Sequence, residues 1–432
     1  MRALLTIPLT FFISISWSQS LEKLIKEKEV SRIMNTLASD DMRGRSALSP
    51  ADIDRAASFI EKEFQKAKLK PLAGMTSYRQ HFQQKSILLE KLDVTISGVS
   101  IPDSLLILVS TKESVEMDAT TALDSISAAQ SLFPSISAME RKPGNKIVFV
   151  APEQSENFKV AKRYLGRGKI VGVDDQSESS TVYILGKPIR VESVKVEARQ
   201  RVEILNMSNV VGMIEGKSLK DEFIIFSGHY DHIGIQPAVE GDSIANGADD
   251  DASGTTAVIT LAKYYSKLKS NERSLIFVAF TAEEIGGFGS KYFSQQLDPN
   301  QVVAMFNIEM IGKPSKWGTN SAFITGFERS NFGEILEKNV QGTQFHFYPD
   351  PYIEQNLFYR SDNATLARLG VPAHSISTDQ IPTDPYYHTV NDEVETLDMT
   401  NIASTIRAIA KGAASIVGGE DTPTRIDATK VK

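Results

Sequence analysis

Histidine and carboxylate side chains follow directly after several apolar runs of this 432-residue chain. His229 and Asp231 come after FIIFSG, Glu283 and Glu284 come after SLIFVAF, and Glu309 lies near the end of VVAMFNIEM. Another stretch, NGADDDASGTTAV, places three aspartates in a row between the first two runs. Imidazole nitrogens and carboxylate oxygens bind divalent metals and transfer protons. The residue types therefore indicate a metal site, an acid–base site, or both.

Any one of these residues means little, because acidic residues at strand ends are common and a lone histidine is more often structural. Together they change the interpretation. Crowded carboxylates raise one another's pKa unless a cation compensates, and no lysine or arginine follows these runs at a suitable place. One zinc needs only three protein ligands, whereas two metals about 3.5–4 Å apart, bridged by a carboxylate, would use all the acids. We expect two Zn²⁺ per chain, with Mn²⁺ or Co²⁺ as alternatives.

Two metals that share one bridging carboxylate need a fifth protein ligand besides the residues at these strand ends, and we expect it to be a histidine. The chain has six histidines. His388 lies in DPYYHTVNDEVETLD, a loop before the last helix that can reach back over a sheet edge. His374 has apolar neighbours and is expected to pack in the interior or beside the site. His81 and His346 have no acidic neighbours, and His232 is expected to line the pocket rather than bind metal.

Strands and helices alternate in the part of the chain that carries these residues. Continuous apolar runs, typical of strands buried on both faces, occur at 223–228, 274–280, 302–310 and 373–378, and helical patterns at 253–270 and 398–417. This alternation predicts an α/β fold, a three-layer α/β/α sandwich with a mixed, largely parallel central sheet. Because ligands bind beyond the carboxyl ends of such strands, the candidate residues should meet at one sheet edge.

Changes in the pattern of apolar residues along the chain predict its domains. Helical patterns occupy residues 21–70, and short apolar runs separated by polar loops follow them. We expect a signal peptide at 1–18, a discontinuous catalytic domain at 19–82 and 204–418, a strand-rich inserted domain at 83–203, and a disordered tail at 419–432. The inserted domain is either similar to protease-associated domains or an unrelated strand-rich cap.

The N-terminus has the order of a cleavable secretory signal: Arg2, an apolar stretch at 3–15, then Ser16 and Ser18. A retained membrane anchor is the alternative, although the stretch is short for a span. We expect a secreted or periplasmic bacterial protein with no stable membrane association after cleavage. The absence of cysteine excludes disulfides and thiolate metal sites. A net charge of −7 without a basic stripe argues against nucleic-acid binding, and no feature specifies an oligomeric state.

Five motifs, in order and spacing, resemble those of the co-catalytic zinc exopeptidases, the group that includes bacterial leucyl aminopeptidases and glutamate carboxypeptidase II. They are SGHYDHIG, NGADDDASGTTAV, FVAFTAEEIGGFGSKYF, NIEMIG and YYHTVND. The resemblance covers roughly 23–80 and 204–418. It implies that Asp250 bridges two metals, that His229 and Glu309 complete one site, and that Glu284 and His388 complete the other.

The resemblance also assigns roles outside the ligand set. It implies that Glu283 is the general base, which takes a proton from water held between two Lewis acids and passes it to the leaving amine. Asp231 would accept a hydrogen bond from the second nitrogen of His229 and fix its tautomer. Asp251, and with less support Asp249, would hold the loop.

The sequence departs from the family at two positions. Glu309 stands where the family usually has aspartate, and Asn363 stands where relatives often have histidine, in a segment that forms the substrate pocket. The function implied is a secreted metal-dependent aminopeptidase whose partners are peptide substrates. The alternatives are a carboxypeptidase of the same family, for which Arg360 could recognise the substrate carboxylate, a glutaminyl cyclase, and a non-catalytic binding member.

Overall fold

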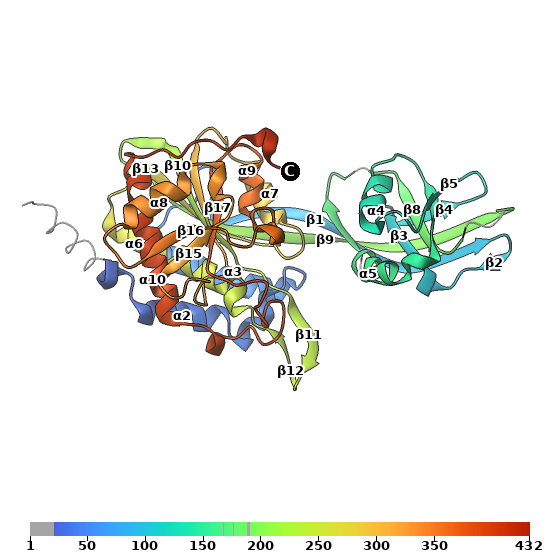
Figure 1. Ribbon diagram of the computed structural model, residues 1–432, viewed down its shortest axis with the longest axis horizontal. Helices are drawn as coiled ribbons and strands as arrows, with labels where there is room; N and C mark the ends of the chain where they lie inside the picture. The colour runs from blue at the N-terminus through green and yellow to red at the C-terminus, as the bar shows by residue number, and fades with distance from the viewer. Residues whose placement is uncertain (1–20, 167, 176, 188–190) are drawn as a thin grey trace, which may run out of the picture. The chain divides into compact units, whose positions relative to one another are not determined.

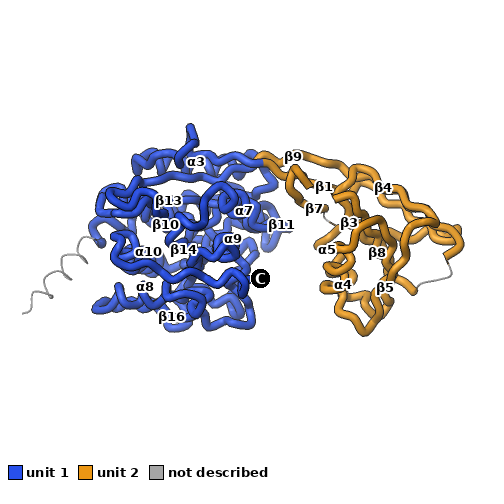
Figure 2. Tube along the Cα trace, turned by 90° about the horizontal axis from the view of Figure 1, so that it is seen from above, with its two compact units in different colours: residues 1–82, 207–432 blue, residues 83–206 orange. Residues whose placement is uncertain are grey.

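The computed structural model describes residues 21–166, 168–175, 177–187 and 191–432, so the expected signal peptide lies outside the described residues. It divides the chain into two compact units, residues 1–82 with 207–432 and residues 83–206 (Figure 2). We had expected the second boundary at 203. None of the helices in the described part is long and apolar enough to span a membrane.

The first unit is built around a mixed sheet whose centre is parallel (Figure 1). Strand β10 (Leu219–His229) pairs in parallel with β13 (Arg273–Phe280) and β14 (Val302–Ile308), and β14 pairs in parallel with β17 (Ala373–Ser377). On one side the sheet continues through β9 (Val194–Ile214), antiparallel to β13, to β1 (Arg79–Ile96). On the other side β15 (Ser321–Ile324) runs antiparallel to β17 and parallel to β16 (His346–Pro349).

Helices cover both faces of this sheet, because its central strands are apolar on both faces. One face packs against α2 (Glu27–Leu37), α3 (Pro50–Lys66), α6 (Gly254–Leu268), α8 (Phe332–Val340) and α10 (Met399–Gly412), which α11 (Ala414–Gly418) follows. The other face packs against α7 (Phe288–Ser294) and α9 (Asn363–Ala367). Phe226 and Phe277 point to the first layer, and Ile225 and Ile276 to the second. The predicted α/β fold with a mixed, largely parallel sheet is confirmed.

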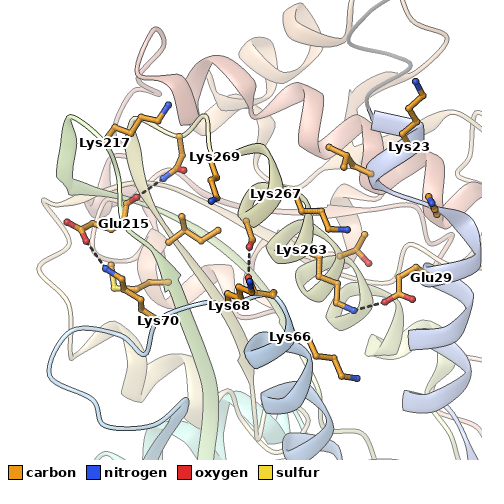
Figure 3. Close-up of a pocket in the computed structure, with 18 residues that line it drawn as sticks. Lys23, Glu29, Lys66, Lys68, Lys70, Glu215, Lys217, Lys263, Lys267 and Lys269 are labelled. Atoms are coloured by element: carbon orange, nitrogen blue, oxygen red, sulfur yellow. Dashed lines mark hydrogen bonds and ion pairs between the residues drawn. The ribbon is translucent and has the colours of Figure 1, made fainter.

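Two local features of this unit matter below. A hairpin of β11 (Gly234–Val239) and β12 (Asp242–Ala245) leads into a π-helical turn at Ala248–Ser253, which contains the triple aspartate and precedes α6. A pocket lined by lysines lies around the ends of α3 and α6 (Figure 3).

The second unit has a four-stranded sheet of its own. Its order is β3 (Leu106–Ser110), β8 (Ser180–Leu185), β6 (Lys146–Val150) and β5 (Ala122–Ile126). Helices α4 (Leu132–Glu140) and α5 (Ser155–Leu165), which the sequence did not predict, pack on one face. The short strands β2 (Val99–Ser100), β4 (Ser114–Met117) and β7 (Lys169–Gly172) pair with the extensions of β1 and β9.

The expectation of a disordered tail at 419–432 is wrong. Ile426 is buried, and its backbone N–H donates to the Gly370 carbonyl at 3.1 Å. The Arg425 guanidinium donates to the Val302 carbonyl at 2.8 Å. The tail is ordered because one apolar side chain and one cation find partners beside the second helical layer.

Candidate metal centre

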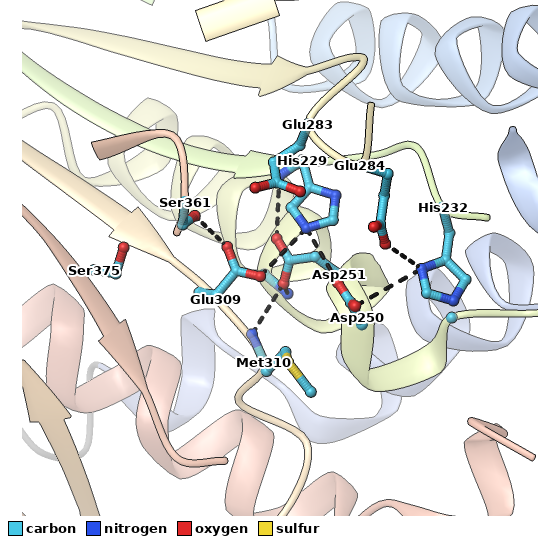
Figure 4. Close-up of polar contacts among 12 residues, drawn as sticks. His229, His232, Asp250, Asp251, Glu283, Glu284, Glu309, Met310, Ser361 and Ser375 are labelled. Carbon is cyan, nitrogen blue, oxygen red and sulfur yellow. Dashed lines mark hydrogen bonds and ion pairs between the residues drawn. The ribbon is translucent and has the colours of Figure 1, made fainter. Parts of the chain in front are cut away.

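The carboxyl ends of β10, β13 and β14 meet at one edge of the sheet. Figure 4 shows five of the candidate residues together there: His229, Asp250, Glu283, Glu284 and Glu309. His229 is the last residue of β10 and lies opposite Phe280, the last residue of β13. Glu283 and Glu284 follow Phe280 closely in the sequence, so they lie at the same edge of the sheet as His229. Glu309 follows the last residue of β14. Because the three strands are parallel and in register, their ends bring these side chains together.

Asp250 lies between two groups of ligand atoms. Its Oδ1 is 3.1 Å from His229 Nε2, which is itself 3.2 Å from Glu309 Oε1. Its Oδ2 is 3.2 Å from His388 Nε2, which is 3.0 Å from Glu284 Oε2. The two oxygens of one carboxylate thus face two separate groups, each with one imidazole and one further carboxylate.

His232 also reaches this site. Its Nδ1 is 2.8 Å from Glu284 Oε1 and 3.9 Å from Asp250 Oδ2. Its Nε2 is buried without a hydrogen-bond partner among the described residues. The sequence analysis expected this histidine to line the pocket; the structure places it against the same carboxylates as His388.

The donor set fits zinc. Two triads, His229 with Asp250 and Glu309, and His232 with Asp250 and Glu284, each have donor atoms within 4.8 Å of one another. Within the described part of the chain, no lysine or arginine forms an ion pair with any of the three carboxylates. Nitrogen and oxygen donors without thiolate, lacking a fixed counter-charge, are what a zinc site supplies.

The ionisation of these groups shows how strongly they attract positive charge. Burial lowers the pKa of His388, but hydrogen bonds to Asp250 and Glu284 outweigh it and raise this pKa to about 10. Burial likewise opposes the protonation of His229, but the charges of Glu309 and Asp250 raise its pKa well above the usual value. Glu283 is half-buried, and desolvation raises its pKa well above that of an ordinary glutamate, although the charge of His229 opposes this shift.

The other two aspartates of the triple hold the loop rather than face the two groups. Asp251 accepts hydrogen bonds from the backbone N–H groups of His229, Gly254 and Met310, at 3.0, 3.0 and 3.1 Å. Asp249 accepts from the Gly312 N–H at 2.7 Å. These bonds join the start of α6 to the ends of β10 and β14. The Asp250–Asp251 peptide bond is cis.

Two further residues fix this loop, and the sequence analysis did not identify them. The Asp392 carboxylate accepts from the backbone N–H groups of Asp249 and Asp250, both at 3.0 Å. Asp392 lies four residues after His388 in the YYHTVND motif, which was the available signal. Arg45 is fully buried and donates to the carbonyls of Tyr230, Asn246 and Gly247 at 2.8, 2.5 and 2.9 Å. No pattern in the sequence indicated it.

The contact expected between Asp231 and His229 is made by a different atom. His229 Nδ1 lies 3.0 Å from the backbone carbonyl of Asp231, and 3.9 Å from its carboxylate. The carboxylate instead accepts from the backbone N–H groups of Glu283 and Glu284, at 3.1 and 3.4 Å. Asp231 therefore orients His229 through its main chain and the glutamates through its side chain.

The other histidines and the pocket residues are placed as follows. His374 is buried, with Nδ1 2.8 Å from the Thr325 carbonyl and Nε2 2.7 Å from the Ser330 hydroxyl, away from the two groups. His346 pairs with Glu337. Asn363 is buried and donates to the Phe358 carbonyl at 3.0 Å, so it supports the pocket segment from behind.

A pocket of about 60 Å³ opens beside Asp250, Glu283 and Glu309. Its apolar lining includes Phe323, Leu357 and Ile381. Its charged lining adds Asp379 and Arg360, and the Arg360 guanidinium lies 3.4 Å from the Tyr387 hydroxyl. The site therefore combines a group of possible metal-binding donors, the half-buried carboxyl of Glu283 and a small, mostly acidic pocket.

Comparisons with known proteins agree with this geometry. Residues 209–413 match the sequence model of peptidase family M28. The aminopeptidase YwaD of Bacillus subtilis is 23% identical over 196 residues, which are 43% of this chain and 40% of that protein. Leucine aminopeptidase 1 of Pyrenophora tritici-repentis is 30% identical over 211 residues, 45% of this chain and 52% of that protein. The chain thus spans about half the length, or less, of these curated relatives. The resemblance to zinc exopeptidases is confirmed.

Solved structures share the fold. An aminopeptidase from Aneurinibacillus sp. strain AM-1 superimposes with a TM-score of 0.58 at 20% identity, over 96% of this chain and 97% of that chain. BSAP, a zinc aminopeptidase from Bacillus subtilis, gives 0.55 at 17% identity, over 94% and 99%. At these identities the likeness establishes the architecture of the chain.

Proposed function

We propose that this chain, whose residues 209–413 match the sequence model of peptidase family M28, is a metal-dependent exopeptidase that removes N-terminal residues from peptides. One observation carries the proposal: the two oxygens of Asp250 face two separate donor groups, and the half-buried Glu283 lies beside them without being a member of either. This is the arrangement that hydrolysis assisted by two metals requires.

We propose that each group holds one Zn²⁺, with Mn²⁺ or Co²⁺ as alternatives. His229 and Glu309 would serve one ion, His388 and Glu284 the other, and Asp250 both. His232, through its contact with Glu284, would orient that ligand, as histidines and carboxylates around zinc sites do. When bound, zinc lowers the pKa of the water it holds and polarises a carbonyl.

Glu283 is suited to act as the proton carrier. Its raised pKa brings it closer to neutrality, where a carboxylate can both accept a proton from water and donate it to a leaving amine. The backbone N–H groups of Glu283 and Glu284 are both held by the Asp231 carboxylate. These two hydrogen bonds fix the backbone positions of Glu283, the proposed base, and Glu284, the proposed ligand, relative to each other.

The charge of the pocket favours an amino terminus over a carboxyl terminus as the bound end of the substrate. Glu283, Glu309 and Asp379 line it, whereas Arg360 is the single lysine or arginine in the lining among the described residues. Burial and the charges of Asp249 and Asp384 raise the pKa of Asp379 to about 9, so an ammonium group beside it would stabilise its ionised form. A carboxypeptidase would need the opposite balance. We further propose that the protein acts outside the cytoplasm, on peptides, after removal of residues 1–18.

The test is a substrate panel combined with metal analysis. The purified protein is assayed on aminoacyl chromogenic amides, on the same amides after N-acetylation, and on peptides with blocked carboxyl ends. We expect hydrolysis of the first and third sets, none of the second, and bound zinc. Loss of C-terminal residues from an N-acetylated peptide with a free carboxyl end would establish a carboxypeptidase instead. Cyclisation of a peptide with N-terminal glutamine would establish a glutaminyl cyclase.

The base is tested with Glu283→Gln, which preserves shape and removes the proton acceptor. We expect kcat to fall by about 10²–10⁴-fold with the zinc content unchanged. Glu328→Gln, at a glutamate that is 71% exposed, is the matched control and should retain activity. Full activity of Glu283→Gln would refute the mechanism.

A further inference from the structure

The first unit has a second pocket, lined by lysines (Figure 3). It has a volume of about 1060 Å³ and is formed by the residues before and within α2, the ends of α3 and α6, and the end of β9. Its lining contains nine lysines and two glutamates. It has no residue in common with the lining of the pocket beside Asp250.

The positive charge here is concentrated and largely unpaired. The whole chain has a net charge of −7, so this concavity is opposite in sign to the protein. Three of its lysines form ion pairs: Lys66 with Glu63, Lys70 with Glu215, and Lys263 with Glu29. The other six form no ion pair with any residue that the structure describes, which leaves the pocket electropositive.

Helix capping explains part of this pattern and not the rest. Lysines at helix C-termini stabilise the helix dipole, which accounts for Lys66 and Lys267. Lys217, however, follows the end of β9, and Lys23 precedes α2. Lys68 and Lys269 have φ of 59° and 50°, a conformation in which glycine is the usual residue after a helix. The lysines that line this concavity come from helices, helix ends and loops that are distant in the sequence.

The walls of the pocket are joined to one another by hydrogen bonds. The backbone groups of Lys70 and Met213 exchange two bonds, at 2.9 and 2.8 Å. The Asn271 amide donates to the Glu215 carbonyl at 3.1 Å, and the Ser266 hydroxyl donates to the Ala67 carbonyl. Thr260, which is 4% exposed and lines the pocket, has a hydroxyl without a partner in the described chain. The concavity is therefore preformed and retains an unused hydrogen-bonding group.

We propose that this pocket binds a soluble anion that carries several phosphate groups. Six exposed, unpaired ammonium groups around one concavity favour a ligand with several negative charges. Lysine binds phosphate well as a point charge, and the volume of about 1060 Å³ lies slightly above the usual range of small-molecule sites, which leaves room for a ligand with several phosphate groups. A phospholipid headgroup offers the same chemistry, but a flat membrane would leave a concave pocket unfilled.

The probe is inorganic tripolyphosphate, titrated calorimetrically into the intact, metal-loaded protein. We expect binding that weakens as salt increases. Lys68→Glu, Lys217→Glu and Lys269→Glu combined should weaken it at least tenfold. The charge-matched control combines Lys316→Glu, Lys338→Glu and Lys430→Glu, three exposed lysines outside the pocket, and should stay within about twofold.

Lysine acetylation read by mass spectrometry tests the unmutated protein, in case the triple variant does not fold. Tripolyphosphate should protect Lys68, Lys217 and Lys269 and leave Lys338 reactive. If both triple variants lose the same tripolyphosphate affinity, the binding depends on the net charge of the protein and not on this pocket. If the pocket variant binds tripolyphosphate unchanged, the phosphate binds elsewhere, at the metal centre. Binding to phosphatidylglycerol vesicles without binding to tripolyphosphate would assign the lysines to a membrane. Each of these three results, like the absence of any binding, would overturn the proposal.

Discussion

Arg45 offers the sharpest test of how the metal loop is held. It is fully buried and donates four hydrogen bonds to backbone carbonyls: those of Leu37, Tyr230, Asn246 and Gly247. Two of these carbonyls belong to the chain that enters the triple aspartate. Burial lowers the pKa of Arg45, while the charges of nearby carboxylates, Asp392 first, oppose that effect. Arg45→Met would keep most of the volume and remove every donor.

The expected loss is set by two opposing effects. Four bonds from a charged donor, at about 1.5–3 kcal/mol each, give on the order of 6–12 kcal/mol. The desolvation cost of the buried guanidinium, several kcal/mol, disappears with it. We therefore expect the free energy of unfolding to fall by about 3–5 kcal/mol, the usual result of breaking a buried charged interaction.

Urea unfolding followed by circular dichroism measures this loss, and kcat/KM under native conditions reports the position of the loop. Arg55→Met is the matched control, because Arg55 is 43% exposed and 3.5 Å from Asp52; it should change stability by less than about 1 kcal/mol. Arg45→Lys keeps the charge but not the planar fork of donors, so its loss of unfolding free energy should lie between those of Arg45→Met and Arg55→Met. A loss below about 1 kcal/mol for Arg45→Met would show that water or other groups satisfy these carbonyls.

Three further predictions separate roles within and beyond the centre. Asp249→Asn should reduce activity about 10–100-fold, as changes beside a metal site do, and Asp250→Asn should reduce both zinc content and activity by at least a further tenfold; equal losses would contradict the assignment. His388→Ala should lower the zinc bound per chain, whereas His232→Ala should lower activity and keep the zinc; the reverse pattern would exchange ligand and orienting residue. Burial lowers the pKa of His374 to about 4, whereas its pKa in the unfolded chain is near 6.5. Between pH 6.5 and about pH 4, His374 therefore binds a proton in the unfolded chain and stays neutral in the folded chain. The free energy of unfolding should therefore fall by about 3 kcal/mol between those pH values, and His374→Gln should lose that slope in urea titrations at each pH.

The sequence predicted that His229, Glu284 and Glu309 would lie close together, because each follows a buried strand. A continuous apolar run is readable without tertiary information, and parallel strands in register must end at the same edge. His229, Glu284 and Glu309 each follow such a run, so their meeting was predictable. The two layers of helices were predicted from the alternation of strand and helix patterns along the chain.

The sequence could not predict the contacts that depend on how loops fold back. Arg45 bonds to carbonyls about 200 residues away, such as those of Asn246 and Gly247, and nothing local distinguishes it from a surface arginine. His232 follows a strand end by three residues, and only the course of the backbone decides that it reaches Glu284. The tail of the chain looked disordered because its few apolar residues, such as Ile426, pack against distant elements.

Glu309 shows how one departure from the family pattern is accommodated. A glutamate is one methylene longer than the usual aspartate, so its carboxylate has more freedom and needs another contact to hold it. Ser361 supplies one by donating to Glu309 Oε2 at 2.5 Å, while Oε1 faces His229. Ser361 in turn accepts from the Asn307 amide at 2.7 Å, and Asn307 accepts from Ser227 at 2.7 Å. This chain of hydrogen bonds crosses from β10 through β14 to the segment before α9. The longer ligand is therefore fixed at both oxygens, and the substitution is compatible with a metal site at this position.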